Sequence, residues 1–149
     1  KRQTGNHGTI RGGGMTSVAL QDVILDALKA DAAVTALVGE RAWDQAPDGA
    51  DYPHITIGPS SFFPDDYDCI TGRVETVQVD VWSRDQGRKW PCKQIVDAVK
   101  RALHDKQGDM GVDALVNMEV ALCQIMDDPD GITTHGVVQV EALIEENDG

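Results

Sequence analysis

A strand, a basic turn and a helix follow one another in the segment VDVWSRDQGRKWPCKQIVDAVKRAL, residues 79–103. Phosphate-binding loops are built from the same three parts. Such a loop needs several glycines, so that backbone N–H groups can surround a phosphate, and a lysine followed by serine or threonine. This turn has the single glycine Gly87, and Pro91 removes a backbone donor where one is needed. We therefore interpret the segment as a charged turn between a strand and a helix, suited to an interface.

The other residues with reactive side chains match no catalytic or metal motif. His54, His104 and His135 come without a G-x-S-x-G nucleophile motif or an H-E-x-x-H zinc motif. The three cysteines are widely spaced, lack a C-x-x-C pair and are expected to be reduced thiols. DDPDG (127–131) lacks the carboxylate spacing of a calcium loop and is predicted to be a turn. The sequence thus predicts no catalytic residues, no cofactor, no metal and no enzymatic activity.

An aromatic and acidic segment, FFPDDYD (62–68), is the main candidate for an interaction surface. Its three aromatic side chains either fold back on the core or form an exposed tip that docks on another subunit. We interpret its acids as a solvated loop rather than a cation site. The candidate interface combines this segment with the basic turn, and its residues are Phe62, Phe63, Asp65, Asp66, Tyr67, Arg84, Arg88 and Lys89.

Two helical regions are predicted from apolar residues at steps of three and four. Residues 17–38 are expected to be helical with one break, with Ser17 as N-cap, Asp31 capping the second part and Gly39 ending it. A second amphipathic helix is expected to begin near Pro91, with its apolar face formed by Cys92, Ile95, Val96, Val99 and Leu103.

Alternating residues predict the strands. Residues 54–58 and 73–82 form one hairpin. In its second strand one face is expected to carry Val74, Val77, Val79 and Val81 and the other Glu75, Gln78 and Asp80, with a slip in the alternation at Thr76 that could be a bulge. Residues 115–125 and 134–146 form a second hairpin around the 127–131 turn. The first strand of this second hairpin is expected to turn Val116, Met118, Val120 and Leu122 to one face, and the second to turn Val138, Val140, Ala142 and Ile144 inward.

The fold class predicted from these elements is α+β, a mainly antiparallel sheet with two long hairpins packed against an N-terminal helix and a central amphipathic helix. The chain of 149 residues is long enough for one domain, which we place at residues 15–149. Residues 1–14 are glycine-rich and carry three basic residues but no acid, and we expect a flexible arm or a cloning remnant. An arm that touches DNA or a neighbouring subunit is the alternative.

Charge is distributed unevenly along the chain, whose net charge is -12. Between Arg84 and Lys106 there are seven Lys or Arg against three Asp, and after Lys106 there are ten Asp or Glu and no Lys or Arg. Phosphates would be repelled over most of such a surface, so tight nucleic-acid binding is not expected. No apolar run approaches the roughly 18 residues of a membrane helix and no signal-peptide pattern is present, so we expect a cytoplasmic product without membrane contact.

Three blocks of the sequence resemble the tail-terminator or tail-completion proteins of long-tailed phages and gene transfer agents. They are LQDVILDALKADAAVTALVGERAWDQAPDGADYPHITIG, VDVWSRDQGRK before an amphipathic helix, and DDPDGITTHGVVQVEALIEE. Together they cover most of residues 18–146, and they are specific as an ordered set. Two features depart from the pattern: Trp90-Pro91 follows GRK where smaller helix-forming residues are expected, and residues 1–14 have no counterpart.

The resemblance implies a structural virion protein located in the tail at the head–tail junction and assembled in the host cytoplasm. It implies a homohexameric ring that caps the tail tube, contacts the tail tube protein and the head–tail connector or adaptor protein, and leaves a lumen through which DNA passes without specific binding. The alternative is a head-side adaptor or stopper component of the same junction. A small enzyme or a cellular adaptor domain is the alternative from another class.

Overall fold

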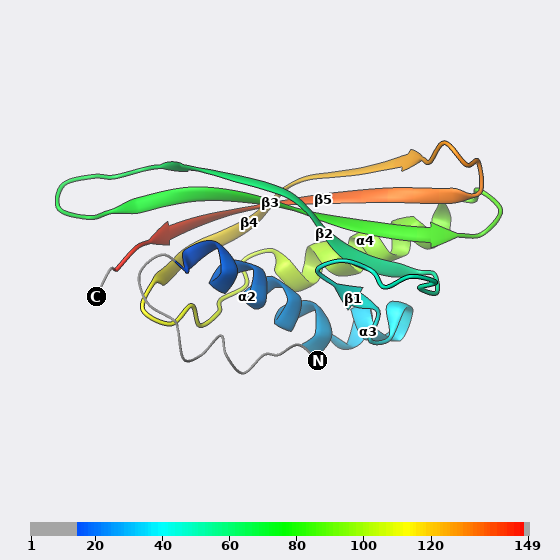
Figure 1. Cartoon of the computed structure of the whole chain (residues 1–149), viewed down its shortest axis with the longest axis horizontal. Coiled ribbons are helices and arrows are strands. Elements are labelled where there is room, and N and C mark those ends of the chain that lie inside the picture. Colours follow the sequence, from blue (N-terminus) through cyan, green and yellow to red (C-terminus); the bar gives the residue numbers. More distant parts are fainter. Residues whose placement is uncertain (1–14, 148–149) are drawn as a thin grey trace.

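The computed structural model describes residues 15–147, and in this range three helices cover one face of a five-stranded sheet (Figure 1). The strand order is β1-β2-β3-β5-β4, and all neighbouring pairs are antiparallel except β1 with β2. The opposite face of the sheet carries no helix (Figure 1). The predicted α+β class with a mainly antiparallel sheet is confirmed. The predicted arm, residues 1–14, lies outside the described residues.

Helix α2 spans Thr16–Ala30 and helix α3 spans Ala32–Val38. The break between them and its cap are as predicted, because the Asp31 carboxylate accepts a hydrogen bond of 3.1 Å from the Val34 N–H. The C-cap Gly39 has φ +61°, a conformation that few other residues adopt. The predicted N-cap was wrong: α2 begins one residue before Ser17, at Thr16, and its N-cap Met15 makes no side-chain hydrogen bond.

The first hairpin joins strand β2, His54–Pro64, to strand β3, Gly72–Arg84. Its far end extends past the helices (Figure 1). The short strand β1, Ala42–Trp43, pairs with β2 only at Ile55 and Thr56. The bulge predicted at Thr76 was wrong, since the pairing of β3 with β5 is unbroken and the irregularity lies on β2, between Ile57 and Ser60.

Strand β3 keeps a regular two-residue period, and a charged residue occupies one of its inward positions. Val77, Val79 and Val81 point toward the helices and are buried. Glu75, two residues before Val77 on the strand, points the same way and is also buried. Val74, predicted on the same face as these valines, lies on the opposite face and is half-buried. A strand with a charged residue at one inward position has the same geometry as a strand whose inward residues are all apolar. In the sequence, however, the charged residue looks like a break in the apolar–polar alternation.

The second hairpin joins strand β4, Ala114–Asp127, to strand β5, Thr133–Glu145. The inward residues predicted on β5 are confirmed and are fully buried. On β4, register shifts after Leu115 and after Val120 each insert one residue and exchange the two faces. For this reason Met118 is buried, whereas Val116 and Leu122 are 47% and 46% exposed, which corrects the predicted common face.

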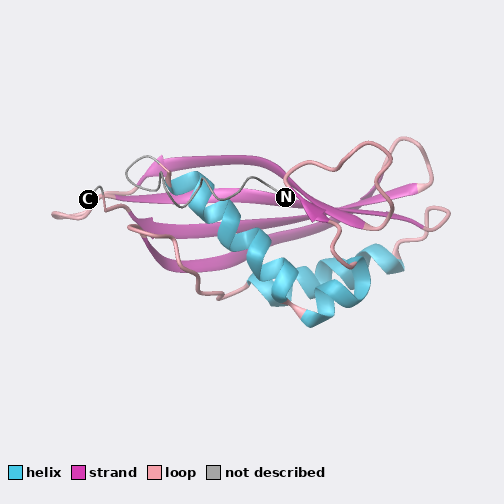
Figure 2. Cartoon of the chain, turned by 60° about the horizontal axis from the view of Figure 1, so that its bottom comes forward, coloured by secondary structure: helices cyan, strands magenta, loops and turns pink. Residues whose placement is uncertain are grey.

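Helix α4, Trp90–Leu103, lies beneath β3, β5 and β4, and it begins where predicted, with Pro91 in its first turn. Its predicted apolar face is buried. The close approach of helix and sheet depends on Gly136 of β5, because a Cβ there would lie 2.9 Å from the Cys92 sulfur. Figure 2, turned toward the helical side, shows α2 crossing the strands obliquely next to α3 and α4.

Candidate functional site

The predicted interface residues fall into two groups that the structure keeps apart. One group lies at the tip of the β2–β3 hairpin, and the other lies at the opposite end of β3 and in the turn that follows it. Strand β3 has 13 residues, which corresponds to roughly 40 Å of extended chain. The two groups therefore form two separate candidate contacts rather than one site.

The hairpin tip presents its aromatic rings to solvent. Phe62, Phe63 and Tyr67 are 52%, 58% and 46% exposed, so of the two arrangements expected for them, the exposed tip is the one found. The Arg73 guanidinium lies 3.7 Å from the centre of the Phe62 ring. The Asp66 carboxylate accepts a 2.9 Å hydrogen bond from the Gly72 N–H and so closes the tip. Asp66 therefore has a structural contact, while the aromatic rings are available for contacts with other proteins.

The basic turn is largely neutralised within the chain. Arg88 pairs with Asp85 at 3.1 Å, and Lys89 pairs with Asp127 at 2.7 Å. Arg84 has three neighbours: its Nε donates to the Thr133 hydroxyl at 2.9 Å, it lies 3.6 Å from Asp130, and its guanidinium is 4.2 Å from the centre of the Tyr52 ring. The contacts of Arg84 and Lys89 fasten the turn to the end of β4 and to the β4–β5 connection. The predicted basic residues therefore present less free charge than their sequence suggests.

Asp130 is the acceptor that organises this connection. Its carboxylate receives hydrogen bonds from the Thr133 hydroxyl at 2.6 Å and from the Thr133 and Ile132 N–H groups at 2.8 and 2.9 Å. These bonds, with the Arg84 charge, lower the pKa of Asp130. The predicted Pro-Asp-Gly turn is thus held by its own carboxylate.

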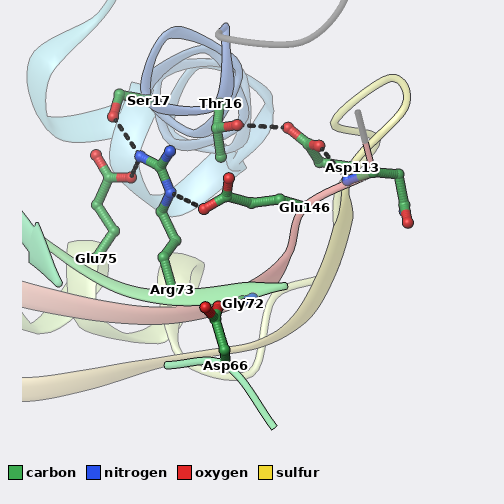
Figure 3. Close-up of polar contacts among 9 residues, drawn as sticks. Thr16, Ser17, Asp66, Gly72, Arg73, Glu75, Asp113 and Glu146 are labelled. Carbon is green, nitrogen blue, oxygen red and sulfur yellow. Dashed lines mark hydrogen bonds and ion pairs between the residues drawn. The ribbon is translucent and has the colours of Figure 1, made fainter. Parts of the chain in front are cut away.

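A network around Arg73 joins three segments at one end of the domain (Figure 3). The Arg73 Nε donates to Glu146 at 2.7 Å, and its Nη1 donates to the Ser17 hydroxyl at 3.1 Å and to Glu75 at 3.3 Å. Burial alone would lower the pKa of Arg73, but Glu146 and Glu75 outweigh burial and raise it. The network links α2 and β3 to the end of β5.

A second contact strengthens the same end of the molecule (Figure 3). The buried Thr16 hydroxyl donates to Asp113 at 2.7 Å, and the other carboxylate oxygen of Asp113 accepts from the Asn147 N–H at 3.0 Å. The sequence prediction missed both clusters, because it placed Glu75 outward and Ser17 in a cap. The available signal was the spacing of Arg73 and Glu75, two residues apart on a strand and therefore on one face.

The helix-free face of the sheet is polar and acidic. The Asp80 carboxylate is bound there by His135 at 2.7 Å and by Gln78 at 2.8 Å, and the His135 ring stacks on Trp82 at 4.0 Å. Glu119 of β4 and Glu141 of β5 are register partners on this face and are exposed. Along the described strands, Arg84 at the end of β3 is the only Lys or Arg on this face.

A groove of about 860 Å³ lies on the helical side, between α2 and the strands β1, β2 and β3. Its lining includes the acids Asp22, Asp26, Asp44 and Glu75, the base Lys29 and apolar residues such as Leu25 and Val77. We refer to this feature as the acidic groove.

Within residues 15–147 no group of three or more His, Cys, Asp or Glu side chains is placed to hold a metal ion. In the same range, no helix combines the length and the apolar character needed to span a bilayer.

The fold is shared with chains of known structure. A chain in the virion of a native gene transfer agent particle superposes with a TM-score of 0.82 at 21% identity, covering 90% of this chain and 100% of that chain. The gp17 protein of bacteriophage SPP1 superposes with a TM-score of 0.58 at 21% identity, covering 92% and 96%. A comparison with curated protein sequences gives no match.

The family model of tail completion protein gp17 matches residues 22–145. The chain belongs to this family, which confirms the resemblance seen in the sequence. It is accordingly a tail completion protein, a structural component of the virion tail with no enzymatic role.

Proposed function

We propose that the protein forms a hexameric ring that caps the tail tube, joins the tail to the head connector and leaves a lumen for DNA. Membership of the tail completion family supports a position at the end of the tail. A ring of identical subunits needs two different surfaces on each subunit that meet head to tail. The two flanks of this domain differ, since one ends in β1 and β2 and the other in β4.

The observation that carries the proposal is the acidity of the helix-free sheet face. Glu119, Glu141 and the bound Asp80 lie on it, and no Lys or Arg accompanies them within the described strands except Arg84 at one end. A lumen lined by this face would repel DNA phosphates, so DNA could pass without being held. A basic lining would instead bind the DNA and oppose its passage.

The two candidate interface groups suit two different neighbours. The aromatic tip and the basic turn lie at opposite ends of β3, so one group can contact the tail tube protein while the other contacts the connector or adaptor. Exposed aromatic rings are typical anchors of protein interfaces. We assign Phe62, Phe63 and Tyr67 to one of these contacts, and Arg84, Arg88 and Lys89 to the other.

The ring is tested by the mass of the purified protein in solution. Light scattering behind size-exclusion chromatography should give a species of about six times the 16.1 kDa chain, and negative-stain electron microscopy should show it as a ring with a central hole. A protein that stays monomeric or dimeric at every concentration would contradict the self-assembling ring.

A further inference from the structure

The flank of the molecule beside β4 carries unpaired positive charge. On α4, which packs against β4, the side chains of Lys93, Lys100 and Arg101 are exposed, with Asp97 among them. None of the three bases has an ion-pair partner within the described range of 15–147. We refer to Lys93, Lys100 and Arg101 as the basic flank.

Contacts of α4 with β4 fix the basic flank at this edge. The N–H of Val120 on β4 donates to the His104 ring at the end of α4. The pKa of the Cys123 thiol on β4 is raised chiefly by burial of the sulfur, and the charges of Lys100 and Asp97 also act on it. Both α4 charges therefore lie beside the outermost strand.

The opposite flank carries the complementary feature. The acidic groove lies along α2, beside β1 and β2, which form the other edge of the sheet. Of its acids, Glu75 is paired with Arg73, whereas Asp22, Asp26 and Asp44 have no ion-pair partner in the described part of the chain. The groove thus offers free negative charge over an apolar floor that includes Leu25 and Val77.

Resting on the ring proposed above, we propose that the basic flank of one copy of this chain docks in the acidic groove of the next copy. The two surfaces are opposite in charge and lie at opposite edges of one sheet, the arrangement that a head-to-tail contact requires. Each subunit then offers one groove and fills another, and the repeated contact forms the proposed ring when the rotation between neighbours closes after six copies.

An apolar anchor is available on the same helix as the basic flank. Trp90, the first residue of α4, is 60% exposed, the largest exposed fraction among the large apolar residues described. Tryptophan is among the residues that contribute most to interface affinity. Trp90 is therefore expected to cover part of the apolar floor of the groove while the lysines meet the carboxylates.

Side chains rather than a continuous sheet carry this contact. The outer half of β2, from Gly58 to Pro64, is an open edge within the described residues, but Pro59 and Pro64 have no N–H to donate. Pairing of this edge with β4 of a neighbour would be interrupted twice. Charge and shape complementarity between the groove and α4 meet no such obstacle.

Two charge-reversed variants test the contact. The first, Lys93→Glu with Lys100→Glu, makes the basic flank acidic, and the second, Asp22→Lys with Asp26→Lys, makes the acidic groove basic. Each variant alone should need more than about tenfold higher concentration than the wild type to form the ring, because like charges then face each other. An equimolar mixture should form the ring again, because every contact in an alternating ring of six joins opposite charges.

The matched control reverses two acids on the sheet face opposite the acidic groove and α4. Glu119→Lys with Glu141→Lys changes the net charge as much as the groove variant does, on the helix-free face of the sheet, and should assemble like the wild type. Circular dichroism and urea unfolding of each variant verify that the subunit remains folded.

The outcomes separate the contact from the ring itself. If the wild type forms rings and each charge-reversed variant alone also forms rings, the contact is overturned and the ring stands. Loss of assembly in both variants without recovery in the mixture would show that the two surfaces do not meet each other. A monomeric wild type would overturn the ring and, with it, this contact.

Discussion

Arg73 compensates a carboxylate that the fold otherwise isolates from water. The Glu75 side chain is 2% exposed, and its ion-pair partner is Arg73, itself 11% exposed. Burying a charge is unfavourable unless it is paired, and removal of one partner leaves the other unpaired. The network is therefore a stability determinant of the end of the domain that carries the aromatic tip.

Arg73→Met should lower the free energy of unfolding by about 2–3 kcal/mol, because Glu75 would remain buried without a counter-charge. Urea unfolding measures the change as a lower midpoint at constant slope. The matched control Arg88→Met removes an exposed pair with Asp85 and should change stability by less than about 0.5 kcal/mol. Equal effects of the two substitutions would contradict the role of the network.

The cysteines should differ in reactivity according to their surroundings. Burial raises the pKa of Cys92 to about 11, whereas Cys69 and Cys123 are exposed residues, although partial burial of its sulfur also raises the pKa of Cys123. Iodoacetamide at pH 8 should modify Cys69 and Cys123 in the folded protein and reach Cys92 only in urea, as peptide mass spectrometry would show. Because the folded pKa of Cys92 is raised, the stability it contributes is present below its unfolded pKa, about 8.5, and declines as pH rises toward 11. Rapid modification of Cys92 in the native protein would show that its site is open.

At the scale of elements, the β2–β3 hairpin combines a packed base with an exposed tip. The base is covered by the helices, and the tip extends beyond them (Figure 1). Exposed rings contribute little to folding, so residues at the tip can change without loss of the domain.

Phe63→Ser should leave stability within about 0.5 kcal/mol of the wild type, while Phe62→Ser should lose about 0.5–1 kcal/mol through its contact with Arg73. Both should reduce the fraction of tails joined to heads, counted by electron microscopy of particles carrying the variant. Joining at wild-type frequency with both substitutions present would remove the tip from the interface. Unfolding of the domain by Phe63→Ser would assign that ring to the core.

Elements with an uninterrupted apolar period are the ones that the sequence predicts correctly. In α4 and β5 every inward position is apolar or small, and their predicted faces are confirmed. In β3 the buried Glu75 has the residue type expected at an outward position. In β4 two bulges exchange the inward and outward faces, and the residue types along the strand do not mark them. A bulge is set by pairing with a neighbouring strand, so alternation along one strand does not reveal it.

The candidate interface was predictable only as a set of residue types. Three aromatics in an acidic loop and a cluster of bases were visible in the sequence, and the structure places both groups at the surface. Their separation along β3 and the pairing of the bases with Asp85, Asp127 and Asp130 depend on the folded chain. The acidic groove was not predictable, because its residues come from α2, β1, β2 and β3.

On the scale of the whole molecule, the two layers carry different patterns of charge. The helical layer carries both the basic flank and the acidic groove, whereas the helix-free sheet face carries the acids Glu119 and Glu141. In a ring whose lumen is lined by the sheet, DNA would meet the acidic layer while neighbouring subunits meet through the helices.

Glu119→Lys with Glu141→Lys should convert a surface that repels DNA into one that binds it. A ring of this variant should retain duplex DNA in an electrophoretic shift at 50 mM salt and release it at higher salt, whereas the wild-type ring should not shift DNA. The exposed pair Asp48→Lys with Asp51→Lys, outside the sheet face, provides equal added charge and should give a weaker shift. Equal shifts for the two variants would argue against a lumen lined by the sheet.

Electron microscopy of particles made without this gene tests the central claim most directly. If the protein is the ring that caps the tail tube, its loss should give tails of uncontrolled length that are detached from DNA-filled heads. Restoring the gene on a plasmid should restore tails of uniform length joined to heads. Tails of normal length that only fail to attach would contradict the capping role and place the protein with the head-side adaptors, and intact normal particles would contradict both roles.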